Sequence, residues 1–187
     1  MSGVVIIGGG IMGSTAAWFL RREGFTGPIS VVEPDPTYQF SSTARSAASI
    51  RMQFGTPLNV RMSLFGVEFF RGIRTIFGPD ADIGYVENGY LILGGPQGAD
   101  ARRKGAAMQQ AEGADVAVLL PDEIAARFPF ISLEGVGIGT FGCTGEGWFD
   151  AWSLLSLMRR AARDCGVRYE KAAVEGFDIG DRVHAVR

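Results

Sequence analysis

Three glycines near the N-terminus constrain the fold of this 187-residue chain more than any other feature. Gly8, Gly10 and Gly13 have the spacing G-x-G-x-x-G, which is a weak signal when it stands alone. Here it follows residues 3–7, an apolar run rich in β-branched side chains that is typical of a strand covered on both faces. Residues 11–23 then have the composition of a helix that stops before a glycine. This order predicts a buried strand, a tight turn and a helix.

A second buried strand is predicted for residues 29–32, and it ends at Glu33. A carboxylate at the end of this strand can accept hydrogen bonds from the hydroxyls of an adenosine ribose. Its charge would repel a 2′-phosphate, so the pattern disfavours NADP. The βαβ pattern therefore predicts a site for the ADP half of a dinucleotide, and it leaves FAD and NAD open. A glycine-rich turn beside a surface glutamate is the alternative.

Each part of this pattern has a physical reason to bind a pyrophosphate. Gly8 permits the tight turn, Gly10 lets the backbone approach the phosphates, and Gly13 lets helix and strand pack closely. Ile11 and Met12 begin the predicted helix, whose unpaired N–H groups and partial positive charge favour an anion. We therefore predict these residues as phosphate contacts.

The rest of the chain departs from the uninterrupted βαβαβ order of a nicotinamide-binding domain. A Ser/Thr-rich stretch over residues 37–56 precedes a helix predicted from Pro57 to about residue 77. The pair Asn88-Gly89 predicts a hairpin of two short strands within residues 84–93. Helices are also predicted at 98–112, 121–127 and 151–164, the last capped by Asp150, and strands at 136–141, 173–178 and 182–186.

Composition excludes several classes of function. The chain is 47% hydrophobic and 20% charged with a net charge of −2, which predicts a soluble globular protein without general attraction to nucleic acid or anionic membranes. No apolar run approaches the length of a membrane span. Cys143 and Cys165 fit neither a disulfide framework nor a zinc site, and His184 is the only histidine. We expect a cytoplasmic protein with reduced thiols, no metal site and no histidine-dependent catalysis.

Longer stretches resemble the D-amino-acid-oxidase-type FAD-dependent oxidoreductases, which include glycine and sarcosine oxidases. The resemblance runs from residue 3 to the end and covers about the N-terminal half of a usual member. It implies an α/β fold (α+β overall), with a Rossmann-like FAD-binding βαβ domain at residues 1–83 and 142–187. Residues 84–141 would form part of an antiparallel-sheet substrate domain. The similar runs are V-V-I-I-G-G-G-I-M-G-S-T-A-A-W-F-L, V-V-E-P-D, S-S-T-A-R-S-A-A-S-I-R-M-Q-F, E-N-G-Y-L-I-L and G-E-G-W-F-D.

The resemblance also implies roles for particular residues around a non-covalent FAD. The strand around Val174 corresponds to the one whose backbone contacts adenine in the family. Arg51 would contact the flavin or an anionic substrate and is the candidate catalytic residue, with a surface arginine as the alternative. Ala48-Ser49 replaces a pair of glycines common in related dehydrogenases. The Ser/Thr-rich loop would approach the pyrophosphate and the flavin through Ser42, Thr43, Arg45 and Ser46.

The function implied by the resemblance is oxidation of the C–N bond of a small amine or amino acid, with the electron acceptor left open. One alternative is an FAD-binding module or fragment without independent catalysis, and a second is an NAD-dependent dehydrogenase. The C-terminal half of the family has no counterpart in the sequence. We therefore expect exposed sheet edges that favour self-association or a complementing chain, and we expect neither a nucleic-acid partner nor a membrane span.

Overall fold

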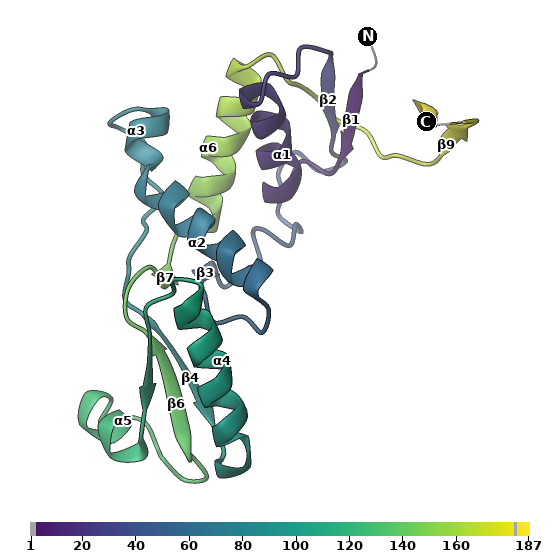
Figure 1. Ribbon diagram of the computed structural model, residues 1–187. Helices are drawn as coiled ribbons and strands as arrows, with labels where there is room; N and C mark the ends of the chain where they lie inside the picture. The colour runs from purple at the N-terminus through teal and green to yellow at the C-terminus, as the bar shows by residue number, and fades with distance from the viewer. Residues whose placement is uncertain (1–2, 182) are drawn as a thin grey trace. The chain divides into compact units, whose positions relative to one another are not determined.

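The computed structural model describes residues 3–181 and 183–187. The chain folds into two compact units that alternate along the sequence. Unit 1 comprises Met1–Ala47 and Asp150–Arg187, and unit 2 comprises Ala48–Phe149. Figure 1 follows the chain through both by colour. We describe each unit by itself.

Unit 1 contains the predicted βαβ arrangement. β1 (Val4–Ile7) pairs in parallel with β2 (Ile29–Val32), and α1 (Ile11–Arg22) connects them (Figure 1). A third strand, β8 (Arg168–Glu170), pairs in parallel with β2, so the sheet order is β1-β2-β8. The chain reaches β8 through α6 (Ala151–Asp164), which packs on α1. The strands and helices of the βαβ prediction are therefore confirmed.

One strand is less covered than its composition predicts. The side chains of Val5 and Ile7 in β1 are 45% and 54% exposed, whereas all of β2 is buried. β1 is an edge strand, paired only with β2 among the described residues. The expectation of a strand covered on both faces is therefore wrong for β1 and correct for β2.

α6 begins where the sequence predicts. The Asp150 carboxylate accepts a hydrogen bond from the N–H of Ser153 at 2.6 Å, and the predicted N-cap is confirmed. Apolar side chains recur on one side of the helix and are buried, as expected of an amphipathic helix against a core. They are Leu154, Leu155, Leu157, Met158 and Ala162.

The C-terminal hairpin of unit 1 starts later than predicted. β9 (Phe177–Ile179) and β10 (Val183–Val186) pair antiparallel, while residues 171–176 have no regular structure. Val174 therefore lies before the strand, and the prediction of a strand over residues 173–178 is wrong at its start. The Glu175 N–H turns instead to the carbonyl of Arg187, at 2.7 Å.

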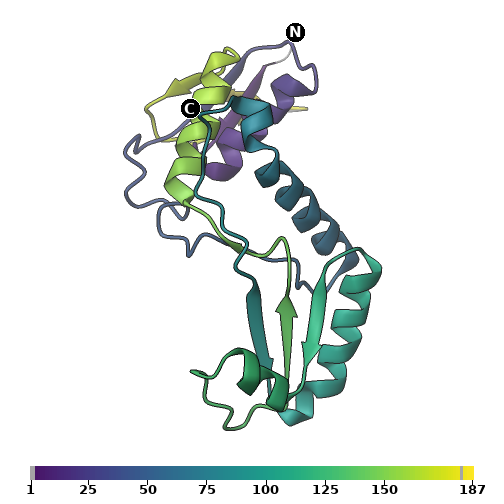
Figure 2. The same ribbon diagram turned by 90° about the vertical axis from the view of Figure 1, so that its left-hand side faces the viewer.

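Unit 2 is built on an antiparallel sheet in the order β4-β6-β5. The strands are β4 (Tyr90–Gly94), β5 (Val116–Leu119) and β6 (Ile138–Gly142). α4 (Ala99–Ala111) runs along this sheet, as Figure 2 shows, and α5 (Pro121–Arg127) packs on β6. The sequence predicted both helices and the central strand, and it missed β5.

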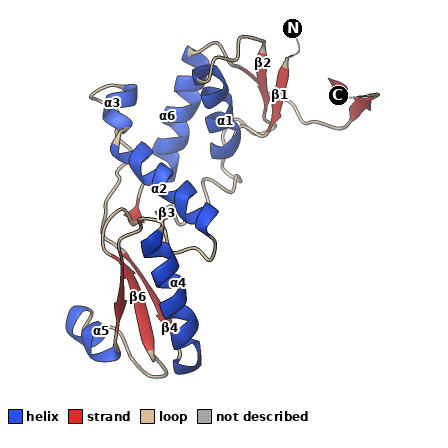
Figure 3. Cartoon of the chain, in the orientation of Figure 1, coloured by secondary structure: helices blue, strands red, loops and turns tan. Residues whose placement is uncertain are grey.

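The remaining elements of unit 2 are short or broken. The helix predicted to run from residue 57 to 77 is two helices, α2 (Pro57–Arg71) and α3 (Ile73–Phe77), with Gly72 between them (Figure 3). Glycine weakens a helix interior, which is the signal that the prediction overlooked. A short 3₁₀ turn, η1 (Pro96–Gly98), leads from β4 into α4.

The hairpin predicted within residues 84–93 does not form. Gly89 has a φ of 81°, in the region that favours glycine, but no turn is assigned at residues 87–89 and the segments on either side pair with different partners. β4 pairs with β6, and Val86 bridges to Trp148. Trp148 belongs to β7 (Gly147–Trp148), which also pairs with β3 (Ser49–Ile50). Long-range pairing therefore overrides the local turn signal.

The boundaries of the two units differ from those of the expected domains. The expected cofactor domain ended at residue 83 and resumed at 142, whereas unit 1 ends at Ala47 and resumes at Asp150. Assignment of the units to cofactor and substrate stays a prediction. None of the described helices is long and apolar enough to cross a membrane.

Candidate functional site

The turn between β1 and α1 has the geometry that its glycines predict. Gly8 has a φ of 95°, in the region that favours glycine, and its N–H donates to the carbonyl of Val32 at 2.8 Å. A Cβ at Gly13 would clash with the Gly8 carbonyl oxygen and lie 3.1 Å from Ile6 Cγ2. The third glycine of the motif is therefore required for the close packing of α1 against β1.

This turn presents donors to open space. The N–H of Ile11 donates to Thr43 Oγ1 at 3.1 Å, but the N–H groups of Met12 and Gly13 have no acceptor among the described residues. A Cβ at Gly8 would meet no atom within 4 Å. Free N–H groups at a helix N-terminus attract an anion, so the donor set fits a phosphate group.

Glu33, predicted to bind the ribose of a cofactor, also accepts hydrogen bonds from the backbone of this chain. Its carboxylate accepts hydrogen bonds from the N–H of Gly9 at 2.8 Å and from the N–H of Asp35 at 2.9 Å. Each carboxylate oxygen keeps a lone pair, so it can still accept from a ribose hydroxyl. Glu33 therefore fixes the glycine turn to the end of β2, a role that the sequence did not suggest.

The other predicted cofactor residues differ in exposure. Thr43 is buried at the N-terminus of α1, whereas Ser42, Arg45 and Ser46 are exposed. The guanidinium of Arg45 lies 5.1 Å from the centre of the exposed Phe40 ring. Val174 is half-buried and outside any strand. The structure thus brings Thr43 to the glycine turn through a hydrogen bond and shows no such contact for Val174.

A buried polar cluster behind the glycine turn was missed by the sequence analysis. Ser14 donates to the Gly9 carbonyl at 2.7 Å and receives a hydrogen bond from the Tyr169 hydroxyl at 3.0 Å. Tyr38 is 1% exposed, and burial raises its pKa. The Arg159 guanidinium lies 4.2 Å from the Tyr38 ring centre. These side chains come from segments far apart in sequence, so no local pattern could reveal them.

In unit 2, Arg51 lines a pocket of about 330 Å³. Its guanidinium lies 5.1 Å from the Phe54 ring centre and 5.7 Å from that of Tyr90. Among the described residues it forms no ion pair with a carboxylate. A cation that contacts two aromatic rings and forms no ion pair fits an anionic ligand. The pocket is lined by Ser49, Ile50, Arg51, Phe54, Ser63 and Tyr90.

A buried carboxylate, Glu146, supports the same segment. It is 0% exposed and accepts hydrogen bonds from the backbone N–H groups of Met52 and Gln53 at 2.5 and 3.1 Å. Burial raises its pKa, and the charge of Arg51 acts in the opposite direction. Glu146 lies in the G-E-G-W-F-D run, but nothing in that run predicted a buried acid.

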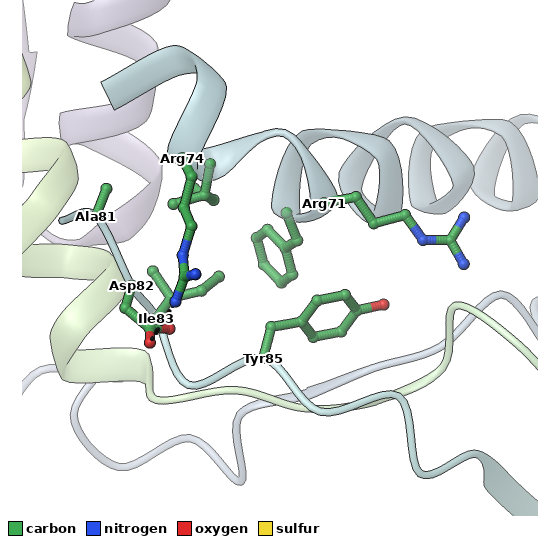
Figure 4. A pocket seen from close by; sticks show the side chains of 8 residues that line it. Arg71, Arg74, Ala81, Asp82, Ile83 and Tyr85 are labelled. Atoms are coloured by element: carbon green, nitrogen blue, oxygen red, sulfur yellow. Dashed lines mark hydrogen bonds and ion pairs between the residues drawn. The ribbon is translucent and has the colours of Figure 1, made fainter. Parts of the chain in front are cut away.

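A pocket of about 220 Å³ shown in Figure 4 also contains arginines. Arg71 is paired with Glu87 at 2.7 Å and with Glu68 at 2.9 Å, and Arg74 is paired with Asp82 at 3.3 Å. These cations are compensated by acidic neighbours, in contrast to Arg51. Within residues 3–181 and 183–187, no cluster of His, Cys, Asp and Glu is arranged to hold a metal ion.

Comparison with known proteins identifies relatives over the whole chain. The sequence model of one family, DAO, described as FAD dependent oxidoreductase, matches residues 3–187. FAD-dependent oxidoreductase domain-containing protein 1 of Xenopus laevis is 40% identical over 186 residues, covering 96% of this chain and 37% of that protein. The Bos taurus protein of the same name is also 40% identical, over 94% of this chain and 38% of its own length. The chain therefore spans little more than a third of these relatives.

Solved structures share the fold. L-proline dehydrogenase from P. horikoshii superposes with a TM-score of 0.81 at 26% identity, over 99% of this chain and 48% of that one. Glycine oxidase from Bacillus cereus gives 0.73 at 23% identity, over 100% of this chain and 51% of that one. L-amino acid deaminase from Proteus myxofaciens, solved in complex with anthranilate, superposes with a TM-score of 0.77 at 20% identity, over 97% of this chain and 41% of that one. The predicted mixed fold is confirmed by these matches.

Proposed function

Since the chain belongs to the DAO family of FAD-dependent oxidoreductases, we propose that it takes part in oxidation of the C–N bond of an amine or amino acid. The open N–H groups at the start of α1 carry this proposal, because they fit the pyrophosphate of the family's cofactor. Names of similar structures, such as proline dehydrogenase and glycine oxidase, support the substrate class.

Unit 1 would hold the ADP half of FAD. The N–H groups of Met12 and Gly13 would bind phosphate oxygens, and Gly8 and Gly10 would leave room for close approach. Glu33 would accept from the ribose hydroxyls. The loop residues Ser42, Thr43, Arg45 and Ser46, and the backbone near Val174, stay proposed contacts. FAD, when bound, supplies the acceptor for a hydride from the carbon next to nitrogen.

Arg51 would bind the substrate in the pocket of unit 2. Its planar guanidinium matches the geometry of a carboxylate, and the rings of Phe54 and Tyr90 limit its freedom. A bound carboxylate would replace the water that otherwise solvates the guanidinium. This proposal makes amino acids better ligands than simple amines.

A second candidate function is an FAD-binding module without independent catalysis. It is favoured by the coverage of relatives, because the chain spans only 37% of the Xenopus laevis protein. Turnover of amino acids with an artificial electron acceptor separates the two. NAD-dependent dehydrogenation, the third possibility from the sequence, is disfavoured by membership of an FAD-dependent family.

The first test is a visible spectrum and a thermal melt with and without added FAD, repeated with NAD. Flavin absorbance that stays with the protein and a raised melting temperature are the expected results. A ligand that binds only the folded state stabilises it by about 2.7 kcal/mol at a hundred times its Kd. A shift with NAD alone would overturn the choice of cofactor.

Two variants of Gly10 make this test specific for the helix N-terminus. Gly10 is the N-cap of α1 and has a φ of −62°, a backbone conformation open to any residue. Gly10→Asp should keep or raise the stability of the free chain, because aspartate is a favoured N-cap. Its charge should abolish the shift caused by FAD. Gly10→Ala is the control for the steric effect of a Cβ, which would lie 3.3 Å from Thr43 Oγ1 in both variants, so the difference between the two variants reports the charge. Equal FAD shifts in the wild type and Gly10→Asp would exclude phosphate binding at this turn.

A further inference from the structure

The backbone that follows Arg51 is held by a side chain 93 to 94 residues away. Glu146 Oε1 accepts the N–H groups of both Met52 and Gln53, the two residues directly after Arg51. A carboxylate that accepts several backbone N–H groups fixes their direction, because charge-assisted hydrogen bonds are short and strong. The course of the chain at Arg51 therefore depends on this acid.

The second oxygen of Glu146 reaches the aromatic side of the pocket. Oε2 accepts from Gln53 Nε2 at 2.8 Å, and the same nitrogen donates to the Tyr90 carbonyl at 2.8 Å. The Tyr90 ring is one of the two that contact the Arg51 guanidinium. Glu146 is thus tied both to the backbone beside Arg51 and to the residue whose ring supports it.

Holding a backbone segment with a buried carboxylate costs desolvation free energy. Glu146 is 0% exposed and forms no ion pair with a basic side chain among the described residues. Burial of a charge without an ion pair destabilises a fold, and the three hydrogen bonds that Glu146 accepts offset part of that cost. The hydrogen bonds of Glu146 converge on the segment that lines the Arg51 pocket, which gives this cost a functional explanation.

We propose that Glu146 is a positioning residue, which orients the Arg51 guanidinium for a carboxylate ligand through Met52, Gln53 and Tyr90. The proposal rests on the role of Arg51 given under the proposed function. It adds that ligand affinity depends on an acid that does not line the pocket.

Glu146→Gln is the informative variant because it keeps the shape of the side chain. An amide is neutral and has one accepting oxygen, so its hydrogen bonds to the Met52 and Gln53 N–H groups lose charge assistance even where that oxygen still accepts them, and it cannot also accept from Gln53 Nε2. The control is Ile124→Val, which removes one buried methyl group from the separate core cluster of Leu119, Ile124 and Phe141.

The first measurement is hydrogen exchange of the free chain, which needs neither cofactor nor ligand. In Glu146→Gln, exchange of the Met52 and Gln53 amides should rise about tenfold relative to the wild type, as expected when a neutral oxygen replaces the charged acceptor of their hydrogen bonds. Ile124→Val should leave these amides unchanged. Unchanged exchange in Glu146→Gln would overturn the proposal, because the charge of Glu146 would then contribute nothing to holding the segment.

The second measurement is calorimetric binding of anthranilate, a small carboxylate, to the full chain with and without FAD. Arg51→Ala should weaken binding about a hundredfold and Glu146→Gln about tenfold, and the double variant should be no weaker than Arg51→Ala. Ile124→Val should bind like the wild type. Non-additivity of this kind shows that Glu146 acts through Arg51, which a general loss of stability would not produce.

The outcomes separate this proposal from the proposed function. Wild-type affinity in Glu146→Gln, or fully additive losses in the double variant, would overturn the positioning role alone. An Arg51→Ala variant that binds like the wild type, or a wild type that binds no anthranilate, would overturn the carboxylate role of Arg51 and the positioning role with it. A wild type that shows no shift with FAD, or equal FAD shifts in the wild type and Gly10→Asp, would overturn the cofactor site without affecting the exchange result.

Discussion

At the scale of single residues, the contributions of Glu146 and Glu87 to the stability of unit 2 should change with pH in opposite directions. Burial raises the pKa of Glu146, whereas hydrogen bonds from Arg71 lower that of Glu87. A raised pKa means that the folded chain binds the proton more tightly than the unfolded chain. The contribution of Glu146 to stability therefore falls as pH rises from about 4.5 through its raised pKa. The contribution of Glu87 is present above about 4.5 and is lost as pH falls through its lowered pKa.

We predict that this difference is measurable in variants. The free energy of unfolding of the wild type minus that of Glu146→Gln should decrease as pH rises from 4.5, because only the wild type has a titrating carboxyl group at position 146. The same difference for Glu87→Gln should decrease as pH falls below 4.5, and by less than about 1 kcal/mol because the pair is partly exposed. Urea unfolding at a series of pH values across this range measures both differences in the free energy of unfolding. Parallel curves for the wild type and Glu146→Gln would contradict the raised pKa.

At the scale of elements, α6 joins the two segments of unit 1 because it packs on α1 and leads into β8. Its first turn depends on the Asp150 cap, whose carboxylate accepts the Ser153 N–H. The motif G-E-G-W-F-D therefore contains two acids with separate tasks. Asp150 starts a helix of unit 1, and Glu146 supports a backbone segment of unit 2.

Asp150→Ala should lower the free energy of unfolding by about 1 kcal/mol, the usual cost of a lost N-cap. Asp150→Asn is the matched control, since asparagine caps helices about as well as aspartate. Thermal and urea melts followed by far-UV circular dichroism measure both. If Asn costs as much as Ala, the charge rather than the cap is responsible, and our account of the start of α6 is incorrect.

At the scale of the whole molecule, several exposed apolar side chains lie on strands. Phe177, Ile179 and Val183 in the C-terminal hairpin are 45%, 72% and 53% exposed, and β1 has an unpaired edge among the described residues. Strand edges with apolar side chains template pairing with another chain. Self-association or pairing with a complementing chain, expected from the sequence, therefore stays a prediction with a structural basis.

We predict that the purified chain associates as its concentration rises, and that Ile179→Thr with Val183→Thr reduces this. Threonine keeps β-propensity while it removes apolar surface. Phe130→Ser is the control, because Phe130 is 82% exposed but lies outside the strands. Sedimentation velocity over a range of concentrations gives the result. A monomer at every concentration would refute the prediction, and equal effects of both variants would assign association to general apolar exposure.

Much of the fold was predictable wherever the deciding interactions are local. The turn at Gly8, the starts of α1 and α6, and the run of β2 follow from backbone freedom, capping and apolar composition. The same local chemistry identified Gly13 as a packing position. Residue roles at a bound cofactor stay predictions, because they depend on contacts beyond the chain itself.

The sequence by itself determined the glycine turn, its helix and the buried strand that follows, because each depends on neighbours within a few residues. Tertiary structure alone decided that Val86 pairs with Trp148 rather than within a hairpin, and that β8 joins β2. It also brought Glu146 to the backbone after Arg51, across more than 90 residues. Such contacts depend on how distant segments pack, and a local pattern of side chains does not contain the free energy of that packing.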